Sequence, residues 1–229
     1  MKNILVKYQD LLTIKEYDLV TNKEEFVFLS LEDKFLIGCY QEKCNMSQYG
    51  KQVPVRKSVY YKLQKVAEKL KEINSNYKLI VVYGFRALEI QKEYFNEIYN
   101  EVKDKFENEM EMLEYIHKKI AVPEVAGHPT GGAVDIAIFD EEKNVIIDFG
   151  SKILDWDDEK CYYNSDEISE VARSNRKLLR ELMINEGFAP FDGEWWHFSY
   201  GDKEWAFYYD KEKALYNQSS AIEVYGYRE

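Results

Sequence analysis

The sequence predicts an α+β fold in a single domain over residues 1–229. Its 229 residues suit one large domain, and a 45% share of hydrophobic residues is enough to bury a core. Stretches typical of strands and helices follow one another without the regular alternation of a βαβ chain, and a hairpin pattern over residues 134–147 adds antiparallel pairing. We expect residues 1–57 to pack as an N-terminal segment on a core of residues 58–206, with 207–229 as a C-terminal extension.

The chain begins with short strands and a helix. Residues 25–29 and 34–38 have the apolar composition of short strands, whereas the polar residues 44–54 predict a loop. Ser58 is suited to cap a helix over residues 58–73, because its hydroxyl can accept a free backbone N–H. The apolar residues of this helix recur at helical spacing and are expected to be buried: Leu63, Val66, Ala67, Leu70 and Ile73.

A buried strand and two helical patterns follow. Residues 79–83 are apolar and rich in β-branched side chains, which favours a buried strand. Helical spacing of apolar residues runs from 88 to about 106 and restarts from 110 to 119. His117 lies in the second pattern beside two lysines, so we expect it to be an exposed helix residue and not a metal ligand.

The second half of the chain contains a hairpin and a long loop. Residues 134–139 alternate as a strand does, which places Asp135 on the face opposite its apolar neighbours. A polar turn and the apolar residues 145–147 complete the hairpin. Residues 155–166 are polar and acidic and predict a long loop, which is often functional.

Another helix and a final strand complete the pattern. Residues 168–186 form the helix, with Ser165 or Asp166 as its cap and Gly187 in a left-handed position after its end. Its expected buried residues are Ile168, Val171, Ala172, Leu178, Leu179, Leu182 and Met183. Residues 195–200 are strand-like.

Composition limits the classes of function. A net charge of −11 repels phosphate backbones and anionic membranes, which argues against nucleic-acid and membrane partners. The apolar run at the N-terminus stops at Lys7, which is too short for a secretory signal, so we expect the cytoplasm. An odd number of cysteines argues against a disulfide framework, and Cys39 and Cys44 lack the second pair of a thiolate zinc site.

Two of the three histidines fall in motifs suited to a metal. Hydrolytic zinc sites take three protein ligands and keep a position open for water, and His128, Asp135 and His197 fit that set. A metal bound in this way lowers the pKa of its water from about 15.7 to about 7. The alternative for Asp135, which the local spacing leaves equally open, is a strand-edge carboxylate that faces water.

Two further residues are suited to act beside this metal. Glu194 precedes His197 by three residues, so it must lie in the turn after Gly193 or at a bulge to approach the same point. It could then be a general base, and the alternative is a surface glutamate beside a core histidine. Arg86 follows a buried strand and could stabilise an oxyanion, and its alternative is a surface salt bridge with Glu89 or Glu93.

The motif HxxGxAxD at residues 128–135, followed by EWWH at 194–197, resembles the zinc D-alanyl-D-alanine dipeptidases. This family belongs to the D-Ala-D-Ala metallopeptidases, which share their fold with lysostaphin-type peptidases and the hedgehog signalling domain. The resemblance covers roughly residues 58–206, and the doubled tryptophan is typical of the dipeptidase branch rather than the carboxypeptidase branch. The fold it implies has a central, mainly antiparallel sheet flanked by helices.

The resemblance also implies roles for individual residues. His128, Asp135 and His197 correspond to the ligands of one zinc ion per chain, and Glu194 corresponds to the general base. Arg86 ends the motif YGFR, which matches the strand-end arginine that stabilises the transition state in this family.

The sequence departs from the family pattern at three positions. Ala87 replaces a proline after the arginine, and Ala126 replaces a serine that lies near the substrate. The segment whose aspartate holds the ammonium of the substrate has one extra residue at 150–155, and Asp155 is its match. These changes leave the zinc chemistry in place and bear on substrate selectivity.

We therefore expect a zinc metallopeptidase that hydrolyses D-alanyl-D-alanine or a similar small dipeptide, and a peptide derived from peptidoglycan is the other candidate substrate. One alternative is a D,D- or L,D-carboxypeptidase or a peptidoglycan endopeptidase of the same fold. A second alternative is a non-enzymatic module that binds zinc or another ligand, but such a module would not need Glu194 or Arg86. The oligomeric state stays open, and histidine and carboxylate ligands accept several divalent ions.

Overall fold

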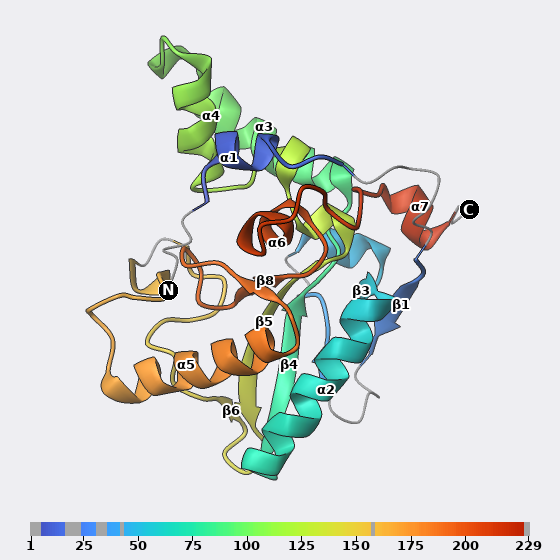
Figure 1. The fold of residues 1–229 in the computed structure, drawn as a ribbon, viewed down its shortest axis with the longest axis vertical. Coiled ribbons are helices and arrows are strands. Elements are labelled where there is room, and N and C mark those ends of the chain that lie inside the picture. Colours follow the sequence, from blue (N-terminus) through green and yellow to red (C-terminus); the bar gives the residue numbers. More distant parts are fainter. Residues whose placement is uncertain (1–5, 17–23, 31–35, 42–43, 157–158, 227–229) are drawn as a thin grey trace.

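A computed structural model describes residues 6–16, 24–30, 36–41, 44–156 and 159–226, and a six-stranded sheet lies at its centre (Figure 1). The strand order is β2-β4-β5-β8-β7, and β6 pairs with β5. All pairs are antiparallel except β2 with β4, which confirms the expected mainly antiparallel sheet. The strands are β2 (Leu36–Gly38), β4 (Tyr77–Tyr83), β5 (Ala133–Asp140), β6 (Val145–Ile146), β7 (Ala189–Pro190) and β8 (His197–Ser199).

In the described residues, a small second sheet and seven α-helices surround this centre. The second sheet pairs β1 (Phe26–Leu29) with β3 (Val53–Arg56). The helices are α1 (Tyr8–Leu12), α2 (Lys57–Ile73), α3 (Leu88–Val102), α4 (Glu109–His117), α5 (Glu170–Asn185), α6 (Lys203–Tyr208) and α7 (Ala221–Tyr225). Five short 3-10 turns lie between these elements in the part of the chain that the structure describes: η1 (Asn45–Tyr49), η2 (Lys103–Lys105), η3 (Pro123–Val125), η4 (His128–Thr130) and η5 (Glu159–Cys161). Within the described ranges, none of the helices has the length and apolar character needed to cross a membrane.

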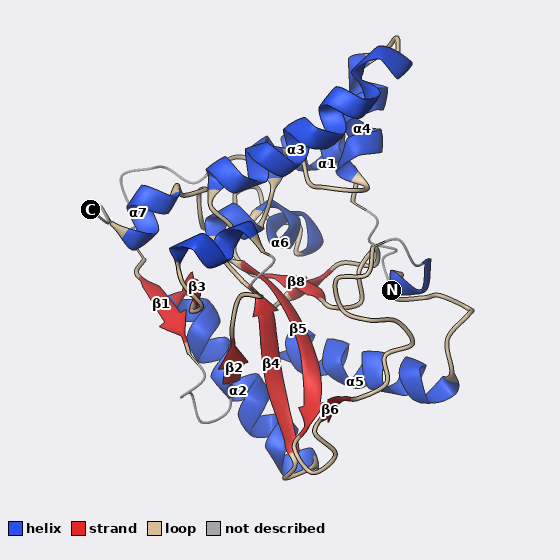
Figure 2. Cartoon of the chain, turned by 180° about the vertical axis from the view of Figure 1, so that it is seen from behind, coloured by secondary structure: helices blue, strands red, loops and turns tan. Residues whose placement is uncertain are grey.

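The helices form two groups about the sheet. Helix α2 packs against β4, and α5 packs against β7 and against α2. Helices α1, α3 and α4 gather at the other end of the molecule, where α1 contacts α4 and α6 (Figures 1 and 2). The site described below lies between these two groups.

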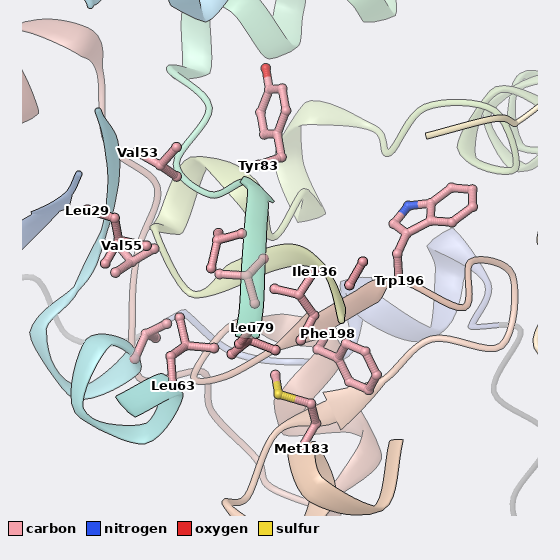
Figure 3. Close-up of a cluster of buried hydrophobic side chains, with 14 of the residues drawn as sticks. Leu29, Val53, Val55, Leu63, Leu79, Tyr83, Ile136, Met183, Trp196 and Phe198 are labelled. Atoms are coloured by element: carbon pink, nitrogen blue, oxygen red, sulfur yellow. The ribbon is translucent and has the colours of Figure 1, made fainter. Parts of the chain in front are cut away.

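The main core fills the space between the sheet and the first group of helices. Leu63 of α2 and Met183 of α5 join Leu79, Ile136 and Phe198 of three adjacent strands in one buried cluster (Figure 3). Burying side chains of this size stabilises a fold by about 1.5–3 kcal/mol each. Because strand residues alternate between faces, the neighbours of Ile136 and Phe198 point away from this core.

The predicted helices are present, but their caps differ from the prediction. Helix α2 begins at Lys57, and the Ser58 hydroxyl does not cap it but donates to Glu24 Oε2 at 3.1 Å. The Glu24 carboxylate also accepts the Ser58 N–H, so a distant residue satisfies the start of the helix. Helix α5 begins at Glu170 with Ser169 as its cap, so the prediction of Ser165 or Asp166 is wrong.

Three further expectations need correction. Ile73 and Val171 were expected to be buried but are 55% and 63% exposed, because they lie in the terminal turns of α2 and α5. The expected loop over 44–54 contains the turn η1 and the start of β3.

Gly187 has the expected left-handed backbone, with φ of +83°. Of the predicted strand 34–38, the first two residues lie outside the described ranges.

Candidate metal centre

A row of three side chains crosses the sheet on the face opposite the main core. Asp135 of β5 is paired in register with His197 of β8 and with Tyr83 of β4. Residues opposite each other on antiparallel strands have Cβ atoms about 4.5–5.5 Å apart. A register shift in β4 before Tyr83 changes the direction of its ring, which points away from Leu79 and Ile136 (Figure 3).

His128 joins this row from the turn η4. Gly131, with φ of +74°, ends the turn and returns the chain to β5. The His128 ring places Nδ1 2.8 Å from the Gly84 carbonyl oxygen. A carbonyl oxygen can only accept, so Nδ1 carries the proton and donates it. This leaves the lone pair of Nε2 directed at Asp135, with Nε2 3.4 Å from Oδ2.

His128, Asp135 and His197 form the one group of three potential metal ligands found among the described residues. Their ligand atoms all lie within 4.8 Å of one another, and all three residues are buried. His197 Nδ1 is 3.1 Å from Asp135 Oδ1. Tetrahedral zinc with ligands at 2.0–2.1 Å separates them by about 3.3 Å, so the donor set fits this metal.

The electrostatics of Asp135 match a cationic partner. Only 1% of its surface is exposed, which excludes the alternative of a strand-edge carboxylate facing water. Burial by itself would raise the pKa of Asp135, but the adjacent His128 and His197 outweigh it and lower the pKa, because positive charge on either imidazole favours the ionised carboxylate. The carboxylate therefore stays ionised between two imidazoles.

Glu194 lies in the turn before β8 and not at a strand bulge. Its carbonyl accepts the His197 N–H at 3.1 Å, and the residue borders the same space as the three potential ligands. The carboxylate is partly buried, and Oε1 accepts the indole N–H of Trp156 at 3.0 Å. Burial raises the pKa of Glu194 to about 7, with His197 opposing and Asp135 adding to the increase. A carboxylate so placed is suited to take up and release a proton.

Arg86 is buried at the exit of β4, so the alternative of a surface salt bridge does not hold. Its Nη1 donates to Gln91 Oε1 at 2.8 Å, and its Nε donates to Tyr83 Oη at 3.3 Å. The guanidinium also lies over the Tyr83 ring, 4.7 Å from the centroid. Its N–H backbone group donates to the His128 carbonyl, which ties the arginine to the turn that carries the first histidine.

One cavity of about 330 Å³ joins these side chains. Its lining includes Arg86, Glu194 and the three potential ligands, and residues of α3 and α4 form one of its walls. His117 belongs to that wall: it is partly buried and its Nδ1 accepts the Val122 N–H at 3.3 Å, so the expectation of an exposed residue is wrong. The sequence reasoning missed three lining residues from later in the chain, Trp156, Phe191 and Glu204.

Two residues singled out in the sequence do not line this cavity. Ala126 is buried and faces a separate cavity of about 240 Å³. Asp155 is partly buried outside the lining, whereas its neighbour Trp156 reaches in. The structure therefore brings together five of the six predicted site residues.

The fold and this cavity define a class of protein. Two imidazoles and a buried carboxylate can hold a divalent metal, while a second carboxylate and a guanidinium border the same space. This is the arrangement of a metal-dependent hydrolase.

Comparison with known proteins gives the family. The sequence model described as D-ala-D-ala dipeptidase, a peptidase family, matches residues 45–219. The chain belongs to this family and is a peptidase. A D-alanyl-D-alanine dipeptidase of Synechocystis is 28% identical over 182 residues, which cover 69% of this chain and 73% of that protein.

A second curated relative and two solved structures are also similar to this chain. A D-alanyl-D-alanine dipeptidase of Enterococcus faecalis is 27% identical over 104 residues, 45% of this chain and 50% of that protein. The LdcB LD-carboxypeptidase structure covers 90% of this chain and 89% of its own, with 15% identity and a TM-score of 0.49. VanYB in complex with D-Ala-D-Ala covers 83% of this chain and 86% of its own, with 17% identity and a TM-score of 0.46.

Proposed function

We propose that this chain is a zinc-dependent dipeptidase that hydrolyses D-alanyl-D-alanine or a similarly small dipeptide to free amino acids. The observation that carries the proposal is the convergence of His128, Asp135 and His197 with Glu194 and Arg86 on one cavity. Membership of the family and the curated relatives described as D-alanyl-D-alanine dipeptidases support the substrate.

The three buried ligands would hold one zinc ion per chain, through His128 Nε2, Asp135 and His197 Nδ1. When bound, the ion lowers the pKa of water and polarises a carbonyl group as a Lewis acid. The three ligands carry the negative charge of one carboxylate, so a bound divalent ion would keep a net positive charge, which suits an electrophilic role.

Glu194 is the general base in this proposal. Trp156 occupies Oε1, which leaves Oε2 to accept the proton of the attacking water. Because burial holds the pKa of this carboxyl near 7, the same group can then deliver the proton to the departing amine nitrogen. One carboxylate thus serves both halves of the hydrolysis.

Arg86 stabilises the charge that develops on the carbonyl oxygen. Its guanidinium stays charged at any relevant pH, and the contacts with Tyr83 and Gln91 fix its position before substrate arrives. A positioned cation at a developing oxyanion is one of the largest contributions to catalysis.

The cavity favours a small substrate. Its volume of about 330 Å³ is near the lower end for small-molecule pockets, which suits a dipeptide. Asp155, the match to the family aspartate that holds the ammonium, stays a prediction, since its neighbour Trp156 is the one in the lining.

The proposal is tested by measuring D-alanine released from D-Ala-D-Ala by zinc-loaded protein, with chelated protein as the control. We expect release that depends on the metal and little release from N-acetyl-D-Ala-D-Ala. Hydrolysis of the acetylated peptide alone would instead make the chain a carboxypeptidase. No hydrolysis of either peptide by protein that binds zinc would reject the dipeptidase assignment.

A further inference from the structure

Glu204 brings a second carboxylate to the ligand His197 from outside the proposed metal position. It lies in the first turn of α6, its side chain is only 14% exposed, and it lines the same cavity. Its Oε2 is 3.3 Å from His197 Nε2, whereas Nδ1 of the same ring faces Asp135. The imidazole therefore lies between two carboxylates, one on each ring nitrogen.

A histidine that binds a metal through one ring nitrogen needs a hydrogen-bond acceptor for the proton on the other, and Glu204 is placed to be that acceptor. A nitrogen that binds a metal must offer its lone pair, so Nδ1 of His197 is unprotonated in the loaded site and the proton resides on Nε2. Nε2 is fully buried and makes no aligned hydrogen bond among the described residues. A buried N–H needs an acceptor, and the Glu204 carboxylate is the one at 3.3 Å.

The first histidine shows the same arrangement with a different partner. His128 binds with Nε2 toward the cluster, and its outer Nδ1–H donates to the Gly84 carbonyl. Each ligand histidine thus has an acceptor on its outer nitrogen, neutral for His128 and charged for His197. Ligating histidines are commonly oriented by such outer acceptors, which also raise the basicity of the ring.

Helix α6 holds Glu204 in place independently of the site. Asp202 caps the helix by accepting the Trp205 N–H at 2.8 Å. The Trp205 indole N–H donates to the Gly187 carbonyl at 3.0 Å, and this anchors α6 to the end of α5. Ala206 on the same helix is fully buried. The carboxylate is therefore presented by a fixed element and not by a mobile loop.

We propose that Glu204 is a positioning residue that accepts the Nε2–H of His197 and so fixes the tautomer and ring orientation that present Nδ1 to the metal. This inference rests on the metal site of the proposed function. Glu204 acts through His197 and does not itself touch the ion or the substrate.

The test is the zinc dissociation constant of the full chain, measured by competition with a chromophoric chelator. Glu204→Ala should weaken zinc binding by about 10–100-fold, the usual effect of losing an outer partner. Glu204→Gln should bind more tightly than Glu204→Ala, because its amide oxygen can still accept. Glu97→Gln is the matched control: it removes a carboxylate that lines the same cavity without contacting a ligand, and zinc affinity should change less than twofold.

A second measurement reads the tautomer directly. With only three histidines in the chain, their ring nitrogens can be resolved by ¹H–¹⁵N NMR of zinc-loaded protein. We expect an Nε2–H proton on His197 that is protected from exchange and becomes exchangeable in Glu204→Ala. If Glu204→Ala does not fold, Glu204→Leu, which keeps most of the side-chain volume but cannot accept a hydrogen bond, decides by the same two measurements.

The possible outcomes separate this inference from the proposed function. If wild-type protein does not bind zinc, the metal site fails and the role of Glu204 fails with it. If wild type binds zinc but Glu204→Ala binds it equally well, only the positioning role is overturned. A raised KM for dipeptide with unchanged zinc affinity would also overturn it, and would make Glu204 a partner of the substrate ammonium.

Discussion

Glu194 enters the cavity with one of its two carboxylate oxygens already engaged by Trp156. Removing its charge while keeping its shape should therefore separate catalysis from metal binding. Glu194→Gln is expected to lower kcat by about 10²–10⁴-fold, the usual contribution of a general base. It should keep its zinc, since Glu194 is not among the three convergent ligands. Steady-state kinetics and metal analysis of the same preparation check both parts.

His197→Ala is the complementary substitution to Glu194→Gln, because it tests a proposed metal ligand and not the proposed general base. It removes one of three ligands, so metal and activity should be lost together, in contrast to Glu194→Gln. Near-normal turnover of Glu194→Gln would remove Glu194 from the mechanism. Full zinc content in His197→Ala would remove His197 from the ligand set.

Single residues differed in how well the sequence predicted them. Asp135 could be placed on the correct strand face because alternation within residues 134–139 is a local property. Glu204 carries no comparable signal, because its contact with His197 arises only when α6 folds back beside β8. His117 has a helical neighbourhood typical of a surface, and the cavity wall it joins is formed by tertiary packing.

Helix α5 anchors the loop that carries Trp156 through one buried arginine. Arg176 is 1% exposed, and its guanidinium donates to backbone carbonyls on both sides of that loop, at Phe149, Lys160 and Tyr162. Arg176→Met should lower the free energy of unfolding by about 2–5 kcal/mol, because it removes a buried guanidinium and its hydrogen bonds to three backbone carbonyls. Urea denaturation measures the difference.

A neighbouring arginine provides the control for this prediction. Arg173, also on α5, makes a surface pair with Glu170 at 3.5 Å. Arg173→Met should change stability by less than about 0.5 kcal/mol, the value of an exposed helical pair. Equal effects of the two substitutions would show that Arg176 does not hold the loop.

Elements were predictable where their pattern is local and long. The strands β4 and β5 and the helices α2 and α5 follow the apolar periods of the sequence closely. Their ends were not predictable: Glu24, from a distant segment, satisfies the start of α2, and Ser169 takes the cap expected at Ser165 or Asp166. A helix cap is the polar group that the folded chain places beside the first free N–H groups, and the apolar period of the sequence does not identify that group.

Zinc should stabilise the whole molecule. A ligand that binds only the folded state adds about 4 kcal/mol when its free concentration is 1,000 times its dissociation constant. For a chain of this size each kcal/mol shifts the thermal midpoint by about 2–4 °C, so we expect an increase of about 8–16 °C over chelated protein. Differential scanning calorimetry measures the shift. His197→Ala should show none, and an unchanged midpoint in wild type would argue against a zinc site within the fold.

At the scale of the whole chain, the sequence was sufficient for the fold class but not for the arrangement of the strands. The irregular order of strands and helices correctly indicated α+β. The order β2-β4-β5-β8-β7 depends on pairings between distant segments, some of them only two or three residues long. Such short strands have no period of their own, and the surrounding packing selects their partners.

The in-register pairing of Asp135 with His197 sets the spacing of these two potential ligands separately from the position of the Glu194 carboxylate. The spacing of these two ligands is inherited from the backbone ladder of the sheet, so a one-residue slip of β8 would turn His197 to the opposite face and abolish the site. Glu194 lies in the adjoining turn, outside the paired residues of β5 and β8. Substitutions in this turn can therefore move the Glu194 carboxylate without changing the strand register that spaces Asp135 and His197, so the turn is one short segment in which hydrolytic specificity can evolve while the sheet is unchanged.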